Sequence, residues 1–154
     1  MRELAAVLGR ERVQLEFLLF KVLALQNLLR TGETRFLRWS AEEINRAGER
    51  LRETELARAR RVFELASAAG VSVDEMALCR LAVTAPEPWR TIFADHDTGF
   101  RQLGIEVERA FATTGALADA SGHAVARLLK QAYRPAAPVA IAGPRQPQET
   151  MVLP

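Results

Sequence analysis

The chain has 154 residues, of which 49% are hydrophobic and 26% are charged, and these values are ordinary for a single globular domain. Its formal net charge is only +2 and its basic residues are spread along the chain, which argues against disorder and against a nucleic-acid-binding face. One cysteine excludes an internal disulfide, and the N-terminal pattern fits neither a signal peptide nor a membrane span, so we expect a cytoplasmic protein.

A long amphipathic helix is predicted over residues 2–30. Positions 1, 4, 8, 11, 15, 18, 22, 25 and 29 alternate three and four apart, and eight of these nine are apolar. Glu11 is the exception. A repeat of 3.5 residues that continues for four heptads is typical of a helix with a coiled-coil seam. Gly32 then supplies the left-handed cap that ends such a helix.

A second helix is predicted over residues 34–69, with Gly70 as its cap. The apolar repeat holds from Leu37 to Leu51, but its strict continuation falls on Glu55 and Arg58. The apolar positions shift here, as in a coiled-coil stutter. We expect the charged residues near the shift to pair along the solvent face of this helix.

A capping box and a proline pair mark the remaining helices. Ser72 and Glu75 have the spacing with which side chains satisfy free backbone N–H groups at a helix start, so a short helix is predicted over 73–83. Pro86 and Pro88 interrupt the chain and suit a first helical turn, so a third long helix is predicted from there to about residue 133. Small and polar residues predict a kink or fraying at 113–122.

The predicted fold is all-α: an elongated antiparallel bundle or coiled coil of three long helices and one short helix, formed by residues 1–133. Five of the seven prolines follow residue 133, and this composition predicts a disordered tail over 134–154.

No constellation of residues points to catalysis, a metal or a cofactor. Asp95, His96 and Asp97 are adjacent, and adjacent side chains on a helix point about 100° apart, so they cannot converge on one ion. Cys79 reads as a small buried hydrophobe on a helix face. The arginines at 58, 60 and 61 lie among glutamates and read as a solvated face.

A partner-binding surface is predicted at the far end of the third long helix, because that helix is longer than the other two. Residues 89–110 can be covered by the first two helices, so Trp89, Phe93 and Phe100 should be core. The apolar residues beyond lack neighbours and should face a partner protein. These predicted partner-binding residues are Phe111, Leu117, Val125, Leu128, Leu129 and Tyr133.

Three stretches are less generic than the heptads: 10–21, the Arg-x-Thr-Glu-Leu-x-Arg segment within 51–59, and the Pro-Glu-Pro-Trp segment within 85–96. Together with the helix–Thr-Gly–helix junction at 28–37, they resemble the flagellar export chaperones of the FlgN type over roughly residues 4–133. The resemblance implies binding to terminal amphipathic helices of hook–filament junction proteins, which keeps them unpolymerised and ready for export. It also implies contact with the flagellar export gate and its ATPase complex, without direct membrane insertion.

Two alternatives stay open from the sequence. The chain also suits a generic coiled-coil adaptor or a helical protein that associates with itself. Its sequence pI of about 9.2 is compatible with a nucleic-acid-associated protein. Under the chaperone interpretation we expect a monomer or a weak homodimer that binds no nucleic acid.

Overall fold

The computed structural model describes residues 1–120, and within this range the chain is helical with no strand. This confirms the all-α prediction. The long helices are α1 (Arg2–Thr31), α2 (Leu37–Ala69) and α4 (Trp89–Ala120), and the short helix is α3 (Leu78–Thr84). Two 3₁₀ turns, η1 (Thr34–Phe36) and η2 (Asp74–Met76), precede α2 and α3. Among these helices none is long and apolar enough to cross a membrane.

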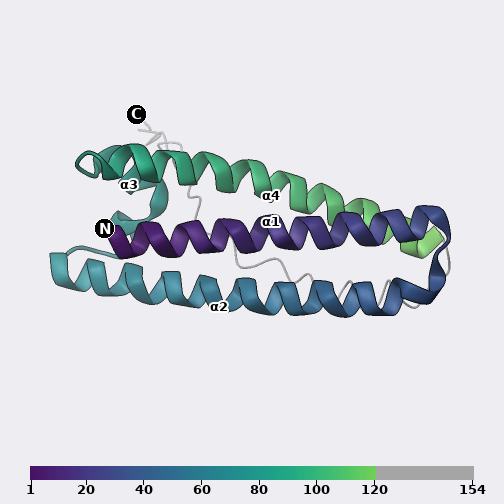
Figure 1. The fold of residues 1–154 in the computed structure, drawn as a ribbon. Coiled ribbons are helices and arrows are strands. Elements are labelled where there is room, and N and C mark those ends of the chain that lie inside the picture. Colours follow the sequence, from purple (N-terminus) through teal and green to yellow (C-terminus); the bar gives the residue numbers. More distant parts are fainter. Residues whose placement is uncertain (121–154) are drawn as a thin grey trace, which may run out of the picture.

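The molecule is a rod with α1 in the middle (Figure 1). α2 runs back along one side of α1, and α4 lies on the other side, parallel to α1. Lys21 pairs with Glu43 across the antiparallel interface, and Gln26 donates to the backbone carbonyl of Ala110 across the parallel one. Within the described residues, α1 packs against both α2 and α4, whereas the backbones of α2 and α4 do not approach each other.

Glycine caps end α1 and α2 as the sequence predicts. Gly32 and Gly70 both have positive φ, 71° and 68°, a conformation that residues with a Cβ rarely adopt. The Gly32 N–H donates to the carbonyl of Leu28, and the N–H of Val71 donates to that of Ala66. Each helix therefore turns sharply into the next element.

The core consists of two clusters. The larger cluster joins the three long helices through buried side chains of Leu18, Val22, Leu25, Leu29, Leu37, Ala41, Ile44, Ala47, Val107, Ala110, Phe111 and Ala118. The smaller cluster fills the end of the rod where α1 begins, and its buried members are Leu4, Leu8, Leu81, Ala85 and Phe93. Trp89 and Phe100 pack against this second cluster, which confirms the prediction that they and Phe93 contribute to the core.

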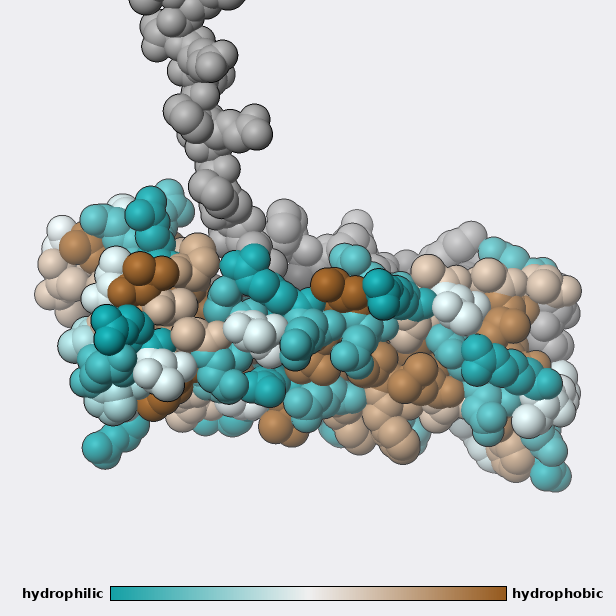
Figure 2. All heavy atoms as spheres, turned by 90° about the horizontal axis from the view of Figure 1, so that it is seen from above, coloured by the Kyte–Doolittle hydropathy of each residue, from teal (hydrophilic) through white to brown (hydrophobic). Residues whose placement is uncertain are grey.

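The polar residues that interrupt the apolar repeats meet between α1 and α2. Glu11 is buried, and its Oε2 accepts a hydrogen bond from Nε of Arg58 at 2.7 Å. The prediction that Arg58 pairs along the solvent face of its own helix is therefore wrong. On either side of Arg58 in the sequence, Leu56 and Phe63 are each 63% exposed, so part of the shifted apolar pattern of α2 faces outward. Seen from above, brown apolar side chains interrupt the teal surface along the rod (Figure 2).

The capping box forms, but the helix after it is shorter than predicted. Ser72 N–H donates to Oε2 of Glu75 at 2.9 Å, and Glu75 N–H donates to Oγ of Ser72 at 3.3 Å. These bonds cap only the 3₁₀ turn η2, because Ala77 is extended, with φ −61° and ψ 143°. The predicted helix over 73–83 is thus divided into η2 and α3.

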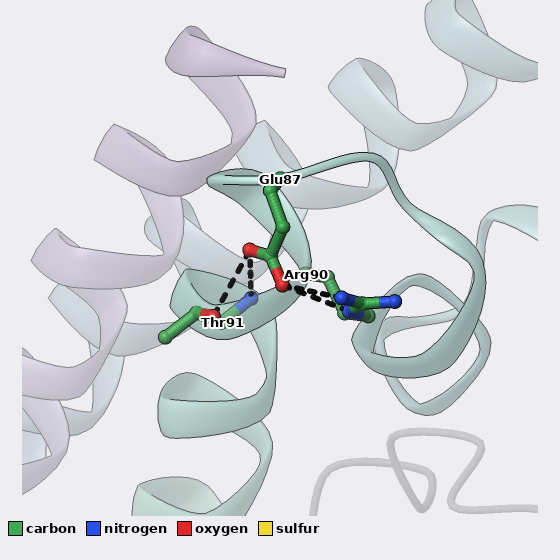
Figure 3. Close-up of polar contacts among 3 residues, drawn as sticks. All are labelled: Glu87, Arg90 and Thr91. Atoms are coloured by element: carbon green, nitrogen blue, oxygen red, sulfur yellow. Dashed lines mark hydrogen bonds and ion pairs between the residues drawn. The ribbon is translucent and has the colours of Figure 1, made fainter.

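Glu87 also caps the start of α4 through polar contacts with Arg90 and Thr91 (Figure 3). The peptide bond between Glu87 and Pro88 is cis. Glu87 Oε2 accepts from the Thr91 hydroxyl at 3.0 Å, and its Oε1 accepts from Nε of Arg90 at 2.9 Å. These bonds lower the pKa of the Glu87 carboxyl, first through Arg90 and then through Thr91. A carboxylate near a helix N-terminus also suits the helix dipole.

The polar stretch of α4 does not break the helix at 113–120. Thr114 is fully buried, and its hydroxyl donates to the carbonyl of Ala110 at 2.6 Å. This local bond satisfies the hydroxyl inside the core, so a threonine is tolerated in the seam. The helix continues through these residues, so the predicted fraying is wrong over 113–120. Residues 121 and 122, and the predicted tail over 134–154, lie outside the described residues.

Candidate partner-binding surface

The two described members of the predicted partner-binding set belong to the core. Phe111 is only 9% exposed, and Leu117 packs against the larger cluster. The idea that both lie past the end of the bundle is wrong, because side chains of α4 as far as Ala118 are buried in the larger cluster. The bond from Gln26 to the Ala110 carbonyl sets α1 and α4 in register, so Thr31 lies level with about residue 115. Val125, Leu128, Leu129 and Tyr133 lie outside the described residues.

An exposed apolar surface is found on α1 instead. Val13, Phe17, Phe20 and Leu23 are 59%, 37%, 60% and 48% exposed. Their spacing of four, three and three residues places them along the same side of the helix over three turns. We call these four residues the α1 stripe. Exposed apolar surface of this length, on a helix already buried along another face, indicates an interaction site.

The packing of α1 explains why the stripe is left uncovered. Leu18, Val22 and Leu25 alternate with the stripe residues and are buried against α2 and α4. α2 and α4 flank this buried seam, one on each side, and among the described residues no third helix covers the remaining face of α1, which carries the stripe. The middle of α1 therefore has apolar residues in the buried seam and also on the face that neither helix covers.

Lys21 contacts the two aromatic rings of the stripe, Phe17 and Phe20. Its Nζ lies 5.1 Å from the ring centroid of Phe17 and 5.6 Å from that of Phe20, within the range of cation–π attraction. The two ring centroids are 6.4 Å apart. Glu43 of α2 accepts a hydrogen bond from the same Nζ at 2.5 Å, and this bond lowers the pKa of the Glu43 carboxyl. The rings are therefore positioned from α2 as well as from α1.

Trp39 extends this apolar surface onto α2. It lies four residues before Glu43 and so shares the side of α2 that reaches Lys21. Its side chain is 64% exposed, and its ring centroid is 5.9 Å from that of Phe36. Although Trp39 stands in the first turn of α2, it is not part of the core. The pair of Lys21 and Glu43 places Trp39 level with about residue 25, near the Leu23 end of the stripe, and tryptophan is among the residues enriched at interface hot spots.

Other exposed apolar residues do not form a comparable series. Leu56 and Phe63 share a side of α2, but only these two residues are involved there. Val83 on α3 and Ile105 on α4 are single positions. Isolated apolar residues are normal on protein surfaces and need no partner. The α1 stripe is the only described series of four on one helix face.

The Asp95–Asp97 segment has structural contacts. Asp95 accepts from Nη1 of Arg12 at 2.8 Å, and Asp97 accepts from Nε of Arg101 at 3.0 Å. His96 lies between α4 and α1, where burial first and the Arg12 charge second lower its pKa. Over residues 1–120 no group of His, Cys, Asp and Glu residues could hold a metal ion.

Sequence reasoning missed the α1 stripe, although a signal was present. The heptad pattern explains the buried positions of α1 and leaves Val13, Phe17 and Phe20 as apolar residues outside the seam. A second apolar series with helical spacing on the same helix predicts a second contact face. Comparison with family models, with curated proteins and with solved structures finds no match for this chain.

Proposed function

We propose that the protein binds an amphipathic helix of another protein along the α1 stripe, and that it acts as a flagellar export chaperone for hook–filament junction proteins. The observation that carries the binding role is the exposure of Val13, Phe17, Phe20 and Leu23 in one line along α1. The flagellar role adds to this the sequence resemblance to chaperones of the FlgN type.

The geometry of the stripe suits a helical ligand. Helices that bind in grooves present apolar anchors at i, i+3, i+4 and i+7, and the stripe repeats with the same spacings. Phe17, Phe20 and Trp39 supply the large apolar area that dominates binding energies at interfaces. Because α1 is held in place by α2 and α4, the receptor face needs little ordering when a ligand binds.

Terminal segments of the junction proteins have the matching property, because they are amphipathic helices that pack together only in the assembled flagellum. Before assembly their apolar faces are exposed and prone to aggregate. A partner that covers such a face in the cytoplasm and releases it at the export gate and its ATPase complex acts as a chaperone without catalysing a reaction.

Titration calorimetry with the full chain tests this function. We expect binding to a terminal helical segment of a hook–filament junction protein and no measurable binding to the filament subunit. Phe20→Glu with Leu23→Glu should weaken the binding at least tenfold, whereas Leu56→Glu with Phe63→Glu, which changes two residues of α2 that are each 63% exposed, should not. Absence of binding to the junction segment would refute the chaperone role.

Sedimentation of the free protein distinguishes the alternative of self-association. A chaperone should sediment as a monomer or as a weak dimer that the junction segment dissociates. A stable dimer that Phe20→Glu disrupts, and that binds no junction segment, would show instead that the α1 stripe pairs with a second copy of the chain.

A further inference from the structure

α3 and the start of α4 form a hairpin at one end of the rod. α3 lies beside the start of α4, and among residues 1–120 its backbone approaches only α4 and the turn η2 (Figure 1). Leu81 of α3 and Phe93 of α4 are buried in the smaller cluster together with Leu4 and Leu8 of α1. We call residues 78–100 the end hairpin. Its apolar attachment to α1 therefore depends on this one cluster.

A gap between the two clusters gives α4 a place to bend. Phe100 is the last residue of α4 that packs against the smaller cluster, and Val107 is the first that is buried in the larger one. Gly104 lies between them, and a glycine inside a helix costs about 1 kcal/mol relative to alanine. Bending of α4 at this point would separate the end hairpin from α1 while the larger cluster stays packed.

The contact between the end hairpin and α1 contains a buried ring nitrogen without a partner. Within residues 1–120, Nδ1 of His96 is buried and forms no hydrogen bond. The His96 ring lies against α1, since a Cβ added to Gly9 would be 4.0 Å from its Cε1. Arg12 of α1 is also close, and its guanidinium binds Asp95 at 2.8 Å. Both ring nitrogens of a protonated histidine are donors, so protonated His96 would bury a donor without an acceptor.

The surroundings of His96 oppose its protonation on balance. Burial first, and Arg12 of α1 second, lower the pKa of His96, whereas Asp95 of α4 raises it. The titratable side chains of α3 are Cys79 and Arg80, and Arg80 is exposed. Because the folded-state pKa of His96 is below 6.5, the stability that neutral His96 gives the closed hairpin is fully present above pH 6.5. It is lost as the pH falls through the folded-state pKa.

The α2 side of α1 responds to acid in the opposite direction. Burial raises the pKa of the Glu11 carboxyl, which is paired with Arg58 of α2, and it also raises the pKa of the Glu55 carboxyl. A group whose pKa is raised by folding stabilises the fold as the pH falls. Acid therefore weakens the contact of α1 with the end hairpin and not its contact with α2.

We propose that the end hairpin is an acid-sensitive latch, which leaves α1 when His96 is protonated beside Arg12, while α2 and the larger cluster stay in place. Opening uncovers Leu4 and Leu8 of α1, an apolar surface that the closed rod hides. The α1 stripe stays in place, since residues 18–29 hold this part of α1 in the larger cluster. The latch acts independently of what the stripe binds.

Hydrogen exchange of the full chain, followed by mass spectrometry, tests the latch. At pH 5.0 the amides of residues 89–100 should exchange through an opening that depends little on low concentrations of urea, because it exposes little surface. Exchange in residues 18–29 should depend steeply on urea, since it requires the whole rod to open. After correction for the intrinsic exchange rate, the protection of residues 89–100 should fall at least about threefold between pH 7.5 and pH 5.0. Equally steep urea dependence in both segments would overturn the latch, and so would constant protection of residues 89–100.

Three single variants identify the trigger. His96→Gln cannot take up the proton and should abolish the fall in protection, and His96→Asn serves as a second uncharged variant if the glutamine prevents folding. The matched control is Asp97→Asn, which removes a neighbouring titratable group whose partner Arg101 lies on the same helix, and it should keep the fall. A fall that persists without the histidine would show that His96 does not control the hairpin, and would overturn the proposal.

Discussion

Arg58 and Glu11 form a partly buried ion pair between the two positions at which the apolar repeats of α2 and α1 fail. The Glu11 side chain is 4% exposed and the Arg58 side chain 21%. Burial raises the pKa of the Glu11 carboxyl, and the nearby guanidinium opposes this shift. A charged residue in an apolar seam is tolerated only where its partner stands opposite, so this pair favours one register between α1 and α2.

Replacing one member of the pair should cost much more stability than replacing both. Arg58→Met leaves the Glu11 carboxylate buried without its cation, and we expect a loss of about 3 kcal/mol in the free energy of unfolding. Glu11→Leu with Arg58→Met restores an apolar seam and should recover most of this loss. Urea denaturation of the two single variants and the double variant measures the coupling. If the stability losses of the two single variants simply add up in the double variant, the two side chains do not interact.

Folding stability should depend on His96 below neutral pH. Its Nδ1 is buried and has no hydrogen-bond partner, and Arg12 of α1 and Asp95 lie nearby. Because the folded-state pKa of His96 is below 6.5, its contribution to stability is present above pH 6.5 and is lost as the pH falls through the folded-state pKa.

The matched variant for this effect is His96→Gln, which cannot take up the proton. Between pH 7.5 and pH 5.5 the unmodified protein should lose more unfolding free energy than His96→Gln does. Burial raises the pKa of the Glu11 and Glu55 carboxyls, so these groups increase the free energy of unfolding as the pH falls. Both proteins contain them, so their effect cancels in the comparison. Parallel curves for the two proteins would exclude a role for His96.

Substitutions in the α1 stripe should weaken partner binding without affecting the fold. Phe20→Glu and Leu23→Glu change side chains that are 60% and 48% exposed, so each should alter the free energy of unfolding by less than about 0.5 kcal/mol. Binding of an amphipathic helix should weaken at least tenfold, or about 1.4 kcal/mol. Thermal melting and calorimetry on the same samples separate the two effects. A large drop in melting temperature would show instead that the stripe supports the core.

Gly99 and Gly104 should respond differently to alanine. A Cβ on Gly104 meets nothing within 4 Å, so Gly104→Ala should stabilise the helix by about 1 kcal/mol. A Cβ on Gly99 would lie 2.7 Å from Cζ of Arg12 and would displace the guanidinium that binds Asp95. Gly99→Ala should therefore raise the free energy of unfolding by less than Gly104→Ala does. When Arg12 is also replaced by Ala, Gly99→Ala and Gly104→Ala should raise the free energy of unfolding equally, as measured by urea denaturation.

Periodicity and caps are local, and for this reason they predict the helices well. The glycines at 32 and 70 end α1 and α2, and the capping box at Ser72 forms. The register between helices is not local. Glu11 and Arg58 each stand out as misfits in the sequence, but their pairing follows only once α2 is placed antiparallel to α1 at the level set by Lys21 and Glu43.

The candidate site was harder to predict for the same reason. Phe111 and Phe20 are both apolar residues on amphipathic helices, and one is 9% exposed while the other is 60% exposed. The difference depends on which side of each helix the neighbours cover. The position of α4, fixed by Gln26 and the Ala110 carbonyl, covers Phe111, and no described helix covers Phe20.

The central place of α1 also sets the order in which the rod opens. α2 and α4 each rest on α1 and make no backbone approach to each other, so one of them can detach while the other stays in place. α1 amides remain protected in either partly open form and should exchange with solvent most slowly. The helix that carries the exposed phenylalanines is thus the last to lose its shape, and a ligand held there would raise the melting temperature of the whole rod.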